Sequence, residues 1–214
     1  SSDLAEFFYE FDKRTPLQDF VKKMETVVYH NKLGSQLERI QRLQHISANI
    51  APKLGVDPEL AKHAAYLLKA DLVTEMVGEF PELQGVMGRY YALAGNESEE
   101  VANAIEKHYF PRFSGDELPD SNLALVVSLA DKLESLVGIW GIGLIPTGDK
   151  DPYALRRAAL GVIRILLENS LDLKQLLEAT FAAFESKGLA NDTVSGLYSF
   201  MMQRLANYLI SVEG

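Results

Sequence analysis

Apolar residues recur along this chain at the spacing of α-helices rather than in the alternation of strands. A helix brings apolar residues back to one face every three to four positions, whereas a half-buried strand alternates them. No run of alternating β-branched residues predicts a sheet. The first helical stretch has apolar positions at Leu17, Phe20, Val21, Met24, Val27 and Val28, and it ends near the turn signal Lys32-Leu33-Gly34. The pattern predicts an all-α protein.

Helix starts and stops are marked by capping residues. Ser35 and Glu38 have the spacing of a capping box, and Gly55 ends the helix that they begin. Asp57 before Pro58 is an N-cap followed by proline at the first helical position. The other predicted starts are Asn96 with Glu99, and Asp151 with Pro152. Helices are predicted over 58–80, 81–94, 97–109, 120–140, 152–169, 172–187 and 193–211.

The clearest irregular segment is IWGIGLIPTGDKDP, residues 139–152, which holds three glycines and two prolines. Such a cluster marks a loop between compact units. We therefore predict a connecting segment over 1–33, a multi-helix bundle over 34–145 and a smaller helical subdomain over 146–214.

Composition changes this picture little. The chain has 214 residues, 47% of them apolar, and no cysteine, which excludes disulfides and thiolate metal sites. Its acidic N-terminus lacks the features of a secretory signal, and no apolar run approaches the length of a membrane span. We expect a cytoplasmic protein with no membrane partner. The net charge of −9 argues against a general polyanion binder but allows a local basic face.

Motifs for catalysis are lacking. No serine lies in a Gly-x-Ser-x-Gly context, and the glycines of 138–148 match neither GxGxxG nor a Walker A loop. No two histidines have the spacing that places metal ligands on one helical face. Distant helices can still bring ligands together, and the residue types available for this are His30, His45, His63, His108, Asp71 and Asp131.

The segments AAYLLKADL, AIEKHYFP and SLADKLESLV resemble, in this order, those of HD-type phosphohydrolases. In that family the middle segment reads approximately AALLHDIGK, and its His-Asp pair binds a divalent metal. The matching positions here are Lys69 and Ala70, while the last ligand position survives as Asp131. The first ligand position falls at Arg42 or His45. The resemblance implies an HD-domain-like bundle.

These replacements disfavour a metal centre. Lys69 brings a positive charge to the place of a cation, and Ala70 supplies no donor atom. We hypothesise that Lys69 forms a salt bridge with Asp131 instead. A working HD-type phosphohydrolase acting on a nucleotide remains the alternative function, disfavoured by the lost His-Asp pair.

Longer segments resemble a second family. KADLVTEMVGEFPELQGVMGRYYA (69–92), PTGDKDPYALRRAALGVIRILLE (146–168) and the N-terminal FFYEFDKRTPLQDFV and VVYHNKLGS are similar to the β subunit of bacterial heterotetrameric glycyl-tRNA synthetase. That resemblance implies an internal piece of a longer β subunit, with a degenerate HD-like domain followed by helices that lead towards an anticodon-binding domain.

The resemblance also implies a division of labour. The α subunit of an α2β2 assembly binds glycine and ATP, whereas the β subunit recognises tRNA(Gly). No catalytic residue, metal or cofactor is then expected in these 214 residues. A purely structural domain that joins its neighbours and touches no RNA is a further alternative.

The best local basic feature lies in 146–168. Arg157 and Arg164 are seven residues apart and share one helical face, with Arg156 and Lys150 close by. Arginine forks suit phosphate oxygens, so these four residues are our candidates for tRNA contact. The alternatives are that they pair with acidic neighbours or contact another domain or the α subunit. An apolar stripe for packing is predicted at Leu155, Ala159, Val162, Ile163, Leu166 and Leu167.

Overall fold

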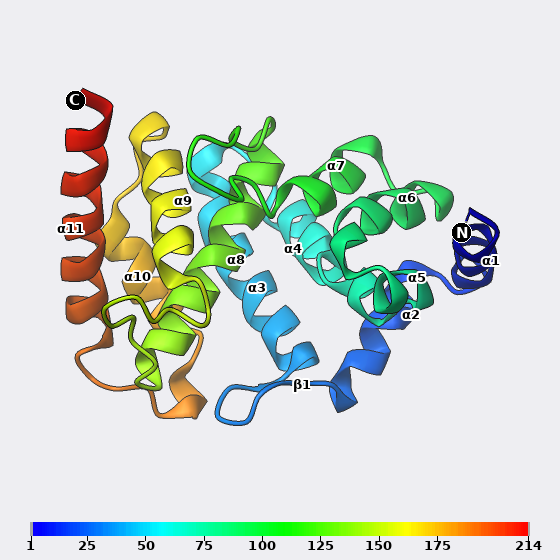
Figure 1. The fold of residues 1–214 in the computed structure, drawn as a ribbon, viewed down its shortest axis with the longest axis horizontal. Helices are drawn as coiled ribbons and strands as arrows, with labels where there is room; N and C mark the ends of the chain where they lie inside the picture. Colours follow the sequence, from blue (N-terminus) through cyan, green and yellow to red (C-terminus); the bar gives the residue numbers. More distant parts are fainter. Residues whose placement is uncertain (1, 214) are drawn as a thin grey trace.

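The computed structural model describes residues 2–213 and confirms the all-α fold. Its eleven α-helices form one elongated bundle, with α1 and α11 at opposite ends (Figure 1). The helices are α1 (Ser2–Asp12), α2 (Leu17–Lys22), α3 (Gln36–Ile50), α4 (Pro58–Leu67), α5 (Glu75–Glu79), α6 (Val86–Ala94), α7 (Glu99–Lys107), α8 (Asn122–Gly141), α9 (Leu155–Glu168), α10 (Leu173–Ala182) and α11 (Thr193–Glu213). None of the helices described is long and apolar enough to cross a membrane.

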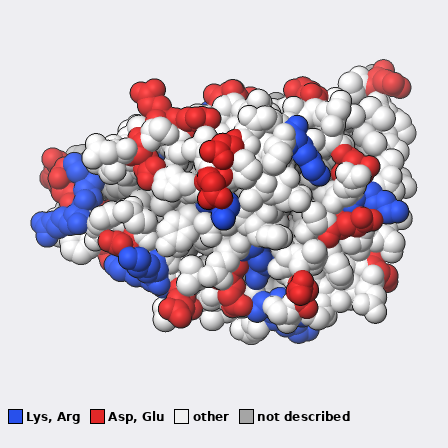
Figure 2. All heavy atoms as spheres, turned by 180° about the vertical axis from the view of Figure 1, so that it is seen from behind, with Lys and Arg blue, Asp and Glu red and all other residues white. Residues whose placement is uncertain are grey.

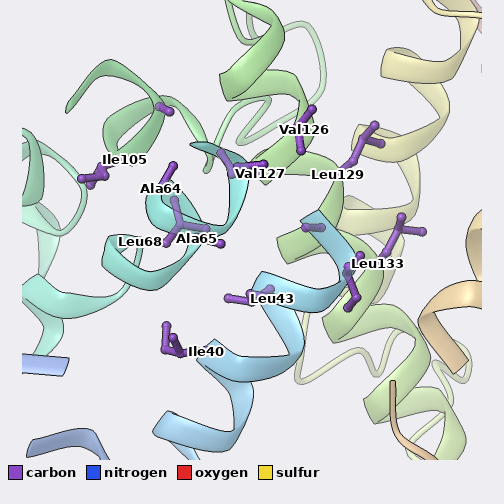
Figure 3. Close-up of a cluster of buried hydrophobic side chains, with 14 of the residues drawn as sticks. Ile40, Leu43, Ala64, Ala65, Leu68, Ile105, Val126, Val127, Leu129 and Leu133 are labelled. Carbon is purple, nitrogen blue, oxygen red and sulfur yellow. The ribbon is translucent and has the colours of Figure 1, made fainter. Parts of the chain in front are cut away.

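Helix α8 is the centre of the bundle. All but three of its residues are buried, because α3, α4, α7, α9, α10 and α11 pack around it. Figure 3 shows buried side chains of α3, α4 and α8 in this core, among them Leu43, Ala65 and Val127. Complete burial of a leucine side chain contributes about 1.5–3 kcal/mol to the free energy of unfolding. These contacts therefore fix the position of α8, including its charged residues Asp131 and Glu134.

The hydrophobic core continues past residue 145. Phe184, which follows α10, is buried against Gly138 of α8 and lies under the Arg42 guanidinium, 4.5 Å from carbon to ring centroid. A Cβ on Gly138 would lie 2.8 Å from the Phe184 ring, so glycine is needed for this close packing. Helices α9 to α11 therefore share the core of α8, and the division at residues 145 and 146 stays a prediction.

The segment 17–35 differs from its prediction. A short helix α2 and a 3-10 turn at Lys23–Thr26 are followed by an antiparallel hairpin of β1 (Val28–His30) and β2 (Gly34–Ser35). Val27 and Val28 were predicted to be core positions, but 37% and 64% of their surfaces are exposed. Here β-branched residues adopt the extended conformation that they favour, so helical spacing alone was misleading.

The predicted helix over 58–80 is interrupted where the LLKADL segment lies. Helix α4 ends at Leu67, a 3-10 turn covers Ala70–Val73, and α5 begins after Thr74. The break is stabilised by side chains: Thr74 caps α5, and the Asp71 carboxylate accepts the N–H groups of Gly85 and Gly88 at 2.6 and 2.9 Å. Asp71 thus caps the start of α6, while the Asp12 carboxylate accepts the N–H groups of Glu75 and Met76 at the start of α5, at 3.0 Å each.

Two predicted caps hold and two change. Ser35 with Glu38 forms the capping box, and Asp57 caps α4. Helix α7 is capped by Ser98, because Asn96 adopts a left-handed conformation with φ 68° in the preceding turn. Helix α9 begins at Leu155 rather than at 152, although the Asp151 carboxylate still accepts its first N–H groups.

Candidate functional site

A buried ion cluster surrounds Asp131 on α8. Lys69 Nζ, after α4, lies 3.0 Å from Asp131 Oδ1, so the salt bridge predicted from the sequence is confirmed. Arg39 Nη2, from α3, donates to the same oxygen at 3.0 Å. Burial by itself raises the pKa of Asp131, but the charges of Lys69 and Arg39 outweigh it and hold that pKa well below its usual range. Asp131 is therefore an anion that joins three helical segments.

The α3 residue that contacts Asp131 is Arg39, and the choice between Arg42 and His45 for the first ligand position stays a prediction. Arg42 instead binds Glu134 and the carbonyl of Leu33. His45 is exposed, because six residues rotate it by roughly 240° from Arg39 about the helix axis. Only the three-dimensional rotation of α3 against α8 selects Arg39.

A second carboxylate extends the cluster. Glu134, one turn after Asp131, is completely buried and accepts from Arg39 Nε at 2.9 Å and from Arg42 Nε at 3.2 Å. Three cations thus meet two carboxylates in the interior. Such an arrangement is stable only while each charge keeps its partner.

His108 completes the cluster from the end of α7. Its Nδ1 bonds to the carbonyl oxygen of Ile105, which places the proton there and leaves Nε2 to accept from Lys69 Nζ at 2.9 Å. Burial and the charge of Lys69 hold the pKa of His108 well below its usual value. A neutral imidazole therefore accepts a hydrogen bond from the buried ammonium group of Lys69.

The residues present do not fit a divalent metal. Ala70 is buried and provides no donor, and Asp131 Oδ1 is already shared by two cationic side chains. Among residues 2–213, no three His, Cys, Asp or Glu side chains converge in a way that could hold a metal ion. A divalent cation at Asp131 would have to displace the Lys69 and Arg39 charges. The cluster therefore presents charges that are paired with one another rather than a free set of metal ligands.

The buried lysines predict an unusual pH dependence. Burial lowers the pKa of Lys69 and of Lys132 from 10.5 to about 8. Between pH 8 and 10.5 the folded chain binds fewer protons at these groups than the unfolded chain does, so the free energy of unfolding rises with pH. We expect a rise of about 2 kcal/mol from each lysine, roughly 4 kcal/mol in all, between pH 8 and 10.

Urea unfolding at pH 7.5, 8.5 and 9.5 measures this rise. A Lys69→Met variant should show a flatter profile, whereas the exposed control Lys53→Met should keep the slope of the unmodified chain. If the free energy of unfolding fell between pH 7.5 and 9.5, burial would not lower the pKa values of Lys69 and Lys132 as described.

The four candidate tRNA-contact residues lie in and before α9. Lys150 and Arg157 are exposed, and Arg156 and Arg164 are half-buried. Within residues 2–213, no acidic side chain lies within 4.0 Å of their charged groups. The ion pairs required by the alternative interpretation are therefore not formed in the part of the chain described.

Helix α9 is held with its apolar face inward, largely as predicted. Leu155, Ala159, Val162 and Ile163 are buried, Leu166 is half-buried, and only Leu167 departs from the prediction, with half of its surface exposed. Figure 2 shows one face of the molecule, where Lys and Arg are interspersed with Asp and Glu. The basic feature of α9 is thus local, on an acidic protein.

Comparisons with known proteins bear on the whole length of the chain. The sequence profile of the family described as glycyl-tRNA synthetase beta subunit matches residues 2–213. A glycine–tRNA ligase beta subunit from Neisseria gonorrhoeae is 60% identical over 202 residues, which cover 94% of this chain and 29% of that protein.

Relatives from other genera agree. Proteins of the same name are 54% identical over 207 residues in Ralstonia nicotianae and 56% identical over 209 residues in Aromatoleum aromaticum. Each alignment covers 96% of this chain and 30% of the relative. The chain therefore spans less than a third of the length of these relatives.

Proposed function

The chain belongs to the family of glycyl-tRNA synthetase β subunits, and on this premise we propose that it recognises and positions tRNA(Gly) for a glycine–tRNA ligase. The family resemblance inferred from the sequence is confirmed by the match over residues 2–213. The proposed role is that of a binding and scaffolding module, and glycine is activated elsewhere in the assembly.

The observation that carries this proposal is the set of unneutralised cations of α9. Arg157 is exposed, and neither it nor Arg164 has a carboxylate partner within residues 2–213. A guanidinium group that is free of intramolecular ion pairs can bind phosphate oxygens without first breaking a salt bridge. Such contacts position an RNA without reading its bases.

The ion cluster around Asp131 supports a non-catalytic role for this chain. Lys69 and Arg39 occupy Asp131, so this part of the scaffold stabilises the bundle rather than activating water. We propose that glycine and ATP bind at the α subunit of a cytoplasmic α2β2 heterotetramer and that this chain uses no cofactor of its own. Its partners are then the α subunit and tRNA(Gly).

Equilibrium binding of the purified 214-residue chain to tRNA(Gly), compared with a non-cognate tRNA, tests this function. We expect saturable binding. The logarithm of the association constant should fall linearly with the logarithm of the salt concentration, with a slope of roughly 0.7–0.9 for each phosphate contacted. Fluorescence anisotropy at salt concentrations from about 25 to 200 mM measures how the binding constant depends on salt. Failure to bind tRNA at the lowest salt would assign RNA recognition to other parts of the subunit.

A further inference from the structure

A cavity of about 330 Å³ opens beside the ion cluster, between α8 and the start of α9. We name it the α8–α9 pocket. Its size lies at the lower end of the range for small-molecule sites, roughly 300–1,000 Å³. It is lined by side chains from the segment after α7, from α8, and from the turn that begins α9, including Tyr109, Arg112, Lys132, Ser135, Tyr153 and Arg157.

The charges that line the pocket are unbalanced. Arg112, Lys132 and Arg157 are three cations, and Asp131 is the one carboxylate among the lining residues described. Asp131 is already bound by Lys69 and Arg39. Arg112 is paired with Asp116, so Lys132 and Arg157 are the cations of the lining that have no carboxylate partner among the described residues, and their charges favour an anion.

Lys132 gives the strongest indication. It is only 7% exposed, and its three N–H donors are used by neutral oxygens: the Ser128 hydroxyl at 2.9 Å and the carbonyls of Phe110 and His108 at 2.9 and 3.3 Å. It therefore offers the pocket a positive charge but no free donor. No carboxylate lies within 4.0 Å of it among residues 2–213. A buried cation without an ion-pair partner is unfavourable unless an anion binds nearby. Its pKa of about 8 keeps it charged at neutral pH.

Arg112 is held ready for an anion. Its Nε and Nη2 donate to the two oxygens of Asp116 at 2.8 and 3.1 Å, and its guanidinium carbon lies 4.0 Å from the centroid of the Phe110 ring. Nη1 makes no hydrogen bond within the described residues. The guanidinium is thus fixed on one side with donors left on the other, an arrangement suited to phosphate.

Two aromatic residues accompany these cations. Tyr153 is 46% exposed at the pocket, and Tyr109 lies at its inner wall. Aromatic rings beside a cationic groove are the platform on which proteins stack nucleotide bases with little sequence preference. We propose that the α8–α9 pocket binds a nucleoside monophosphate group, with the phosphate held by Arg112 and Arg157 in the positive field of Lys132 and the base against Tyr153. This group occurs both in free mononucleotides and at the 5′ end of an RNA.

Titration calorimetry of the 214-residue chain with adenosine 5′-monophosphate at low salt tests the pocket. We expect saturable binding, weaker binding of inorganic phosphate, and no binding of adenosine alone. Arg112→Gln should weaken nucleotide binding at least about tenfold, because a charge-assisted contact is lost. Arg112 has half of its side chain exposed, so this variant should fold, and its circular dichroism spectrum checks that it does.

The matched control separates this inference from the proposed function. Arg164→Gln lies on α9 outside the pocket, so it should weaken tRNA binding and leave nucleotide binding unchanged. Competition by a short RNA with and without a 5′ phosphate then identifies the source. Displacement of the nucleotide only by the phosphorylated RNA assigns the site to an RNA end, and displacement by neither assigns it to a free nucleotide.

Two results would overturn the inference. If adenosine 5′-monophosphate did not bind at millimolar concentration while tRNA still bound, the α8–α9 pocket would not be a nucleotide site. The tRNA-recognition proposal would be unaffected. Equal nucleotide affinity in the Arg112→Gln and unmodified chains would show that any binding occurs elsewhere.

Discussion

Replacing Asp131 with asparagine is expected to lower the free energy of unfolding by about 3–5 kcal/mol, the range for breaking a buried ion pair by removing one partner. The substitution is nearly isosteric, but it removes the negative charge to which Lys69 and Arg39 are bound at 3.0 Å each. Both cations are buried and would then repel each other in a medium of low polarity. Urea unfolding at pH 7 measures the loss.

The matched control is Glu117→Gln. Glu117 also forms an ion pair, with Lys107 at 3.4 Å, but 68% of its side chain is exposed. An exposed pair contributes only about 0–1 kcal/mol, so this variant should differ little from the unmodified chain. If Asp131→Asn were as mild as Glu117→Gln, the cluster would not be the stabilising element described above.

The pH profile provides an independent check on Asp131. Its pKa is depressed in the folded state, so its stabilising contribution is present in full above the unfolded pKa, about 3.9. This contribution is lost as the pH falls further and the carboxylate protonates. The Asp131→Asn variant should therefore approach the stability of the unmodified chain only in strong acid.

Reversing the charge of Arg157 and Arg164 together is expected to reduce affinity for tRNA(Gly) at least tenfold at low salt. Each phosphate contact that is removed lowers the salt slope by about 1, so the double variant should have a slope shallower by about 2. Both residues are on one face of α9, and neither forms an ion pair within the described part of the chain. Fluorescence anisotropy with labelled tRNA measures affinity and slope together.

A matched pair of substitutions controls for net charge. Lys53→Glu with Lys174→Glu makes the same change in total charge at exposed positions on other elements. This control should lose far less affinity than the α9 variant. Equal losses in the two variants would mean that only the overall charge of the protein matters, and that α9 is not a specific contact.

Local signals account for the features that the sequence predicted well. Ser35 and Glu38 cap α3 because both partners lie within one helical turn, and Asp57 caps α4 for the same reason. The salt bridge between Lys69 and Asp131 could also be predicted, since the resemblance to HD-type phosphohydrolases aligns both residues with former metal ligands.

Features that depend on distant contacts could not be read from spacing. The interruption after Leu67 is stabilised by Asp71, whose hydrogen-bond donors Gly85 and Gly88 are 14 and 17 residues away. Arg39 was missed for a similar reason, because its selection depends on how α3 is rotated against α8. A buried arginine and a buried glutamate on apolar helices look like surface residues in a sequence.

Glycylation of tRNA by the full-length β subunit assembled with its α subunit tests the central claim most directly. With Arg157→Glu and Arg164→Glu in place, we expect the KM for tRNA(Gly) to rise at least tenfold. Glycine-dependent exchange of pyrophosphate into ATP should stay unchanged, because activation is proposed to occur in the α subunit. An unchanged KM, or a loss of exchange activity, would contradict the assignment of tRNA positioning to this chain.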